Sequence, residues 1–99
     1  MREDYFTTTE LAYLLHVGSD KLRRIIAGPF ELPAYLVGAR YVIPKSKFFG
    51  WYEKMKRERT LRAALGISKV NHDEVYAARD EWLRERYAVT KGVAHHGQP

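Results

Sequence analysis

The sequence predicts a mainly α-helical fold with one small β-hairpin. Apolar residues recur at helical spacing in four separate stretches of the 99-residue chain. Two short runs rich in Tyr, Val and Ile are separated by the two residues Gly38-Ala39, which is typical of a hairpin. The length allows one small domain with an appended helix. Together these observations indicate a helical domain that carries a hairpin and ends in a C-terminal helix.

The first helix is predicted to begin at a capping box. Thr7 and Glu10 have the Thr-x-x-Glu spacing in which each side chain bonds the other residue's backbone N–H. Leu11, Leu14 and Leu15 follow as an apolar stripe. Residues 1–5 are polar, and we expect no element there.

A tight turn over residues 16–18 is predicted to join the first helix to a second. His16 stands where the chain needs a left-handed residue, a conformation that His tolerates better than most residues. Either Gly18 or Ser19 is expected to cap the second helix. Gly28-Pro29 ends it.

The second helix has one apolar side and one basic side. Leu22, Ile25 and Ile26 form the first, and Lys21, Arg23 and Arg24 form the second. A short helix pair whose second member is basic on its outer side is the layout of a helix–turn–helix that enters a DNA groove.

Strands over residues 34–37 and 40–43 are predicted to form the hairpin, and Gly38 suits the first position of a type II′ turn. A third helix is predicted from Lys45 to at least Lys56, with a possible continuation to Leu65 and a stop at Gly66. The apolar residues of this helix are Phe48, Phe49, Trp51, Tyr52 and Met55.

A last helix is predicted from a second capping box, Asn71 and Glu74, to about Tyr87. If Val75, Trp82 and Leu83 face a second chain, the protein is a dimer. If they pack on their own domain, it is a monomer, and we favour this packing because a small core needs cover. The predicted organisation is a DNA-binding domain over residues 5–58, a helical extension over 59–88 and a disordered tail over 89–99.

The net charge is +5, and its basic excess is unevenly distributed. Residues 1–47 carry a net charge of +2, residues 48–66 a net charge of +3, and residues 67–99 none. This balance favours nucleic acid as a partner only weakly. The chain has no cysteine, no apolar run that could span a bilayer and no signal-peptide core. We therefore expect a cytoplasmic protein that does not bind membranes.

Three segments resemble the excisionase-type winged helix–turn–helix, a relative of the MerR DNA-binding domain. They read FTTTELAYLL, VGSDKLRRII and ELPAYLVGARYVIPKSKF, and they lie within residues 5–55. The last segment is the most specific, because it combines a Leu-Pro, an aromatic strand, a glycine turn, an Arg and an Ile-Pro. The resemblance implies a mainly α-helical fold with a β-hairpin wing, in which the second helix lies in the major groove of DNA and the wing touches the adjacent backbone or minor groove.

The resemblance assigns DNA contacts to Arg40 at the wing tip, to Lys45 at the start of the next helix, and to the groove side of the second helix: Ser19, Asp20, Lys21, Arg23 and Arg24. Arg23 and Arg24 can read guanine or grip phosphates. Lys21 is expected on a phosphate. Asp20 either accepts from a cytosine amine or acts as a partner of the helix dipole.

The function implied is that of an excisionase, a recombination directionality factor. Such a protein binds and bends attachment-site DNA, alone or as a cooperative array, so that a separate tyrosine recombinase excises a mobile element. One alternative is a small winged-helix transcriptional regulator. Another is an adaptor whose C-terminal helix binds a recombinase or polymerase.

No enzymatic activity, cofactor or metal is expected. The sequence contains no Gly-rich phosphate loop and no nucleophile motif, and His72, His95 and His96 lack a third ligand at metal spacing. The densest basic run comprises Lys54, Lys56, Arg57, Arg59 and Arg62. We expect it to be either a solvated helix face or a second contact to a DNA backbone.

Overall fold

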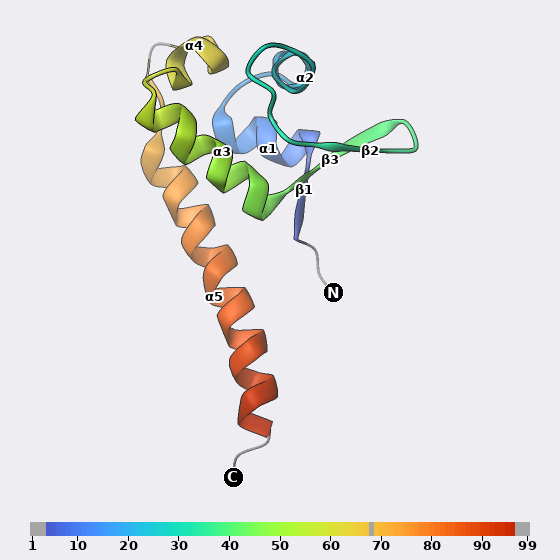
Figure 1. The fold of residues 1–99 in the computed structure, drawn as a ribbon, viewed down its shortest axis with the longest axis vertical. Coiled ribbons are helices and arrows are strands. Elements are labelled where there is room, and N and C mark those ends of the chain that lie inside the picture. Colours follow the sequence, from blue (N-terminus) through green and yellow to red (C-terminus); the bar gives the residue numbers. More distant parts are fainter. Residues whose placement is uncertain (1–3, 68, 97–99) are drawn as a thin grey trace.

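The computed structural model describes residues 4–67 and 69–96 and contains five helices and three strands there. Figure 1 shows them in the order β1 (Tyr5–Thr7), α1 (Thr8–Leu15), α2 (Ser19–Ala27), β2 (Tyr35–Val37), β3 (Arg40–Pro44), α3 (Lys45–Arg57), α4 (Leu61–Leu65) and α5 (His72–His96). The predicted class, mainly helical with a small antiparallel sheet, is confirmed.

The predicted signals at both ends of α1 are confirmed. The Glu10 backbone N–H donates to Thr7 Oγ1 at 3.1 Å, and the Thr7 N–H donates to Glu10 Oε1 at 3.0 Å, which completes the capping box. His16 ends α1 in the left-handed region with φ 59°. Gly18 is the N-cap of α2, so this helix begins at Ser19.

The sheet has three strands in the order β1-β3-β2, with both pairs antiparallel. The expectation that residues 1–5 form no element was wrong at Tyr5, because Tyr5 begins β1 and pairs with Pro44 on β3. The hairpin turn is the predicted one. Gly38 has φ +63°, and Ala39 is not among the described residues of positive φ, which is the type II′ pattern.

The possible continuation of α3 to Leu65 is absent, because the chain turns after Arg57. Arg59 takes a left-handed φ of 61°, and the Thr60 N–H then donates to Met55 O at 2.9 Å. This closing bond satisfies a carbonyl at the helix end, and the chain restarts as the separate helix α4. Gly66 ends α4 with φ 69°, as predicted.

At the start of α5 only half of the predicted capping box forms. The Glu74 N–H donates to Asn71 Oδ1 at 3.4 Å, but the Glu74 carboxylate bonds His16 Nε2 at the α1–α2 turn. The end of α5 also differs from the prediction, because the helix continues past Tyr87 to His96 where a disordered tail was expected. This stretch contains no proline, and Gly92 alone does not end a helix. Residues 97–99 lie outside the described residues.

One apolar core joins all the helices. It includes Leu11 and Leu15 of α1, Leu22 and Ile25 of α2, and the five predicted apolar residues of α3: Phe48, Phe49, Trp51, Tyr52 and Met55.

The start of α5 covers this core. Val75 is buried, and the Trp82 ring lies 5.4 Å from the Phe49 ring. The Trp82 indole N–H donates to Asp4 Oδ1 at 3.4 Å. These two side chains therefore pack on their own domain, whereas Leu83 and Tyr87 are exposed. In Figure 1 the rest of α5 extends well beyond the other elements.

Candidate nucleic-acid interface

Helix α2 is divided into a buried apolar side and an exposed basic side. Leu22 and Ile25 are buried in the core, whereas Arg23 and Arg24 are exposed. The N-cap Gly18 offers no side-chain hydrogen bond, so no cap side chain occupies the N–H groups of the first turn, where the half-buried Ser19 lies. The exposed side of α2 thus offers guanidinium groups and helix N–H groups, both of which bind phosphate oxygens.

Asp20 is paired on this exposed side. Arg23 Nη1 donates to Asp20 Oδ1 at 2.9 Å, and the two side chains are 54% and 88% exposed. An ion pair this exposed contributes little to stability, and either partner can leave it at low cost. Asp20 also lies in the first turn of α2, where its charge complements the helix dipole.

Lys21 has turned away from the exposed basic side of α2. It is half-buried, and its ammonium group lies against Gly66 at the end of α4, where a Cβ on residue 66 would approach Lys21 Nζ to 2.5 Å. A cation at the C-terminal end of a helix is favourable. The side chain assigned to a phosphate contact from the sequence thus packs between α2 and α4.

Arg40 opens β3 directly after the hairpin turn. It is exposed and lies opposite Val37 of β2. The hairpin projects from the body of the molecule in Figure 1. All three residues of β2 are exposed although they are apolar or aromatic, namely Tyr35, Leu36 and Val37. The hairpin therefore presents one guanidinium next to an uncovered apolar strand.

Lys45 begins α3 and is held at the base of the sheet. Its backbone N–H donates to Asp4 O at 2.7 Å, which extends the pairing of β1 with β3. Its ammonium lies 5.1 Å from the centre of the Phe6 ring. Lys45 as a whole is half-buried, and its ammonium is attracted to the face of the Phe6 ring.

Tyr13 is an exposed residue that the sequence reasoning did not single out. It lies on α1 and is 85% exposed. In a helix–turn–helix the first helix crosses the DNA backbone, where a tyrosine hydroxyl can donate to phosphate. The signal available in the sequence was a large aromatic residue off the leucine stripe of α1.

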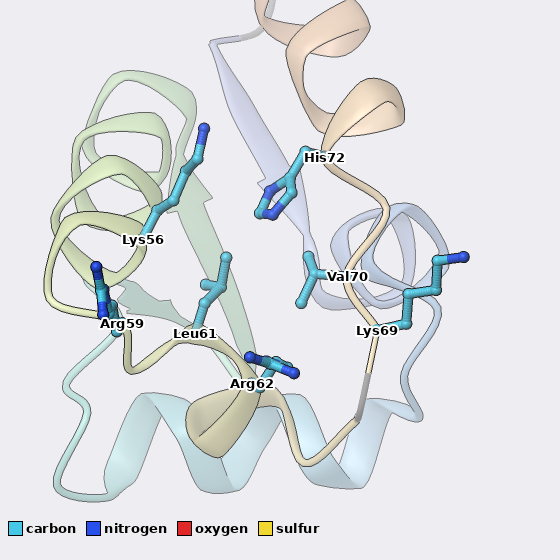
Figure 2. Close-up of a pocket in the computed structure, with 7 residues that line it drawn as sticks. All are labelled: Lys56, Arg59, Leu61, Arg62, Lys69, Val70 and His72. Carbon is cyan, nitrogen blue, oxygen red and sulfur yellow. The ribbon is translucent and has the colours of Figure 1, made fainter.

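A second group of cations lines a pocket of about 370 Å³ between α3, α4 and the start of α5. Figure 2 shows Lys56 and Arg59 on one side, His72 on the other and Arg62 below them. The Tyr52 hydroxyl and His72 Nδ1 are hydrogen-bonded at 2.7 Å, and burial raises the pKa of Tyr52. The sequence reasoning recognised the basic run but not its meeting with Lys69 and His72.

Comparison with known protein families, sequences and structures identifies no relative of this chain. No family model, no curated protein and no solved structure matches this chain. In the described part of the chain, no helix has the length and apolar character needed to cross a membrane. Among the same residues, no group of three His, Cys, Asp or Glu side chains is arranged to hold a metal ion. The side chains of His95 and His96 lie outside that description.

Proposed function

We propose that this chain is a sequence-specific DNA-binding protein built as a winged helix–turn–helix. In this proposal α1, the turn and α2 are the helix–turn–helix, and the β2–β3 hairpin is the wing. The observation that carries the proposal is the pair of exposed guanidinium groups, Arg23 and Arg24, on the side of α2 opposite its buried Leu22 and Ile25. A groove-entering helix needs this division between a packed side and a basic outer side.

The side chains take different roles. Arg23 and Arg24 are the candidates for guanine O6 and N7, where a bidentate contact adds about 1–3 kcal/mol of discrimination. Arg40 reaches the minor groove or the backbone beside it. Lys45 supplies a phosphate contact from the base of the sheet. Lys21 supports α2 against α4 and is removed from the set of direct contacts, because its ammonium lies on Gly66.

Within this function we propose an accessory role in DNA recombination, as an excisionase that bends attachment-site DNA for a separate tyrosine recombinase. One α2 and one wing make few contacts. Bending a site costs about 1–6 kcal/mol. Several copies on neighbouring sites are therefore needed to offset that cost, so binding in a cooperative array is expected.

The test begins with sites selected from a random duplex library. These sites are titrated by gel shift at two salt concentrations, on circularly permuted fragments that report bending. Stepwise, cooperative shifts at repeated sites with a bend support the accessory role. One discrete shift at a palindrome without bending favours a transcriptional regulator instead. A complex that does not survive competitor DNA overturns sequence-specific binding.

Two variants locate the interface. Arg23→Ala and Arg24→Ala should each weaken specific binding by about tenfold or more, since each removes a charge-assisted contact. The matched control is Arg84→Ala, which removes the same charge from an exposed position on α5. Equal losses in all three variants would mean that only net charge matters, and this result would refute groove entry by α2.

A further inference from the structure

The pocket between α3, α4 and α5 carries a concentration of positive charge that DNA binding by α2 does not use. Lys56 and Arg59 come from the end of α3 and the turn after it, Arg62 from α4, and Lys69 from the connector. No acidic residue lines the pocket. Four formal positive charges therefore surround one cavity, and each raises the electrostatic cost of the others.

Few acidic side chains of the described residues lie close enough to neutralise the pocket cations. The Arg59 and Lys69 side chains have no hydrogen-bond or ion-pair partner there. Glu53, an acidic residue that acts on Lys56, bonds Arg79 at 3.5 Å. Lys56 donates to the Tyr76 hydroxyl, and this hydrogen bond raises the pKa of Lys56. Among the pocket cations, Arg59 and Lys69 therefore have guanidinium and ammonium donors available to a ligand.

The pocket also has apolar residues and a hydrogen-bonded histidine in its wall. Leu61 and Val70 form apolar wall, and His72 is fixed in orientation by its hydrogen bond to Tyr52. In Figure 2, Lys56 and the His72 ring lie across the cavity from each other, Arg59 lies at its edge beside the end of α3, and the Lys69 ammonium extends away from it. Arg59 projects from a left-handed backbone position at the turn after α3, and its side chain is exposed. Guanidinium groups on fixed backbone match oxyanions better than flexible surface lysines do.

We propose that this pocket is a binding site for phosphoryl oxyanions, separate from the α2 and wing surface. The volume of about 370 Å³ admits two adjacent phosphoryl groups. Such groups come from two sources, a free nucleotide or pyrophosphate-like metabolite, and the backbone of a nucleic acid. Their chemistry at the pocket is the same: anionic oxygens accept from Arg59 and from the remaining N–H groups of Lys56.

The first experiment uses inorganic pyrophosphate as the probe and the full chain as the protein. Backbone amide shifts are followed by NMR at constant ionic strength. Saturable shifts confined to residues 56–62 and 69–72 are expected. Arg59→Ala should weaken pyrophosphate binding by about tenfold, as expected for one charge-assisted contact. The substitution keeps a Cβ at residue 59, so the backbone conformation is under the same constraint as in the wild type.

Arg57→Ala is the matched control, because Arg57 is an exposed residue of the same helix end that does not line the pocket. It should bind pyrophosphate as the wild type does. Shifts that spread over all exposed cations would overturn the proposal. Equal weakening by Arg57→Ala and Arg59→Ala would do the same, since both results describe a diffuse positive surface.

A second arm separates the two sources. The salt dependence of binding to the selected duplex is measured for the same two variants. If Arg59→Ala lowers the slope of log K against log salt by about 1 and Arg57→Ala does not, the oxyanion is a backbone phosphate. If pyrophosphate binds and the slope is unchanged, the ligand is a free phosphorylated compound. The pyrophosphate arm needs no DNA, so it stays informative even if α2 does not enter a groove.

Discussion

Replacing Asp20 by Asn tests whether α2 faces DNA, because the proposal predicts that losing a carboxylate from this helix strengthens binding. Asp20 is 88% exposed and bonds Arg23 at 2.9 Å. Asn keeps the shape of the side chain and removes its charge. The substitution therefore removes repulsion between the carboxylate and DNA phosphates, and it frees Arg23 to contact DNA.

The size of the effect follows from that exposure. In bulk water, two unit charges about 4 Å apart interact by about 1 kcal/mol, and by less at larger distances. An exposed ion pair such as Asp20–Arg23 contributes about 0.2–1 kcal/mol, which the free protein loses when Arg23 turns to DNA. The two terms together amount to at most about 2 kcal/mol, so affinity at low salt should be tighter by up to about thirtyfold. Because both charges are exposed, the gain should vanish near 1 M salt.

Fluorescence anisotropy with selected and unrelated duplexes measures this change at several salt concentrations. The control is Asp73→Asn, since Asp73 lies in the first turn of α5 as Asp20 lies in that of α2. Each variant loses a helix-dipole partner, which lowers the unfolding free energy by about 0.3–1 kcal/mol. Asp20→Asn loses in addition the exposed ion pair with Arg23, so its unfolding free energy should fall slightly further. If Asp20→Asn weakened binding to the selected site alone, Asp20 would be a base contact and the reasoning from repulsion would be refuted.

Three further predictions concern stability. Trp82→Ala should lower the unfolding free energy in denaturant titrations by about 3 kcal/mol. The control is Leu83→Ala, because Leu83 is the exposed neighbour of Trp82. An equal loss in the control would contradict the packing of α5 described above. Gly66→Ala should lower the melting temperature, with a cost of about 1 kcal/mol, since φ is +69° and the new Cβ would meet Lys21 Nζ. Gly18→Ala meets nothing within 4 Å but places a poor N-cap residue before α2, so it should cost about 0.5 kcal/mol. A loss larger than that of Gly66→Ala would argue against this backbone account. Wild-type stability should fall above about pH 10, because the Tyr52 pKa is raised by burial and only the unfolded tyrosine ionises there. Urea titrations at several pH values should show a smaller decline in Tyr52→Phe. At neutral pH the substitution should cost about 0.5–1.5 kcal/mol, because the hydrogen bond to His72 is lost. A decline as steep as in the wild type would exclude Tyr52 as its cause.

Signals that act within a few residues of sequence were predicted well. The Thr7–Glu10 capping box, the left-handed His16 and the stop at Gly66 depend only on local backbone geometry. The two sides of α2 follow in the same way from periodicity. Three-residue β1 was missed because its pairing partner, β3, lies far along the chain and too few residues show a period of two.

The positions of the cations could be predicted only in part. Arg23 and Arg24 are exposed because helical spacing places them opposite the core. The sequence near Lys21 offers no partner for its ammonium group. Only the packing of α4 against α2 brings Gly66 next to it. The pocket also forms by chain reversal, since the left-handed Arg59 breaks the helix and brings α4 and the connector back toward α3.

The bond between His16 and Glu74 joins the turn before α2 to the first turn of α5. If α2 binds DNA as proposed and this binding depends on the bond, a partner that binds α5 and breaks the bond changes DNA affinity, and DNA changes the partner's affinity by the same factor. The pair is half exposed, so its free energy is at most about 1 kcal/mol. Communication through this bond alone is therefore limited to about a fivefold change in either affinity.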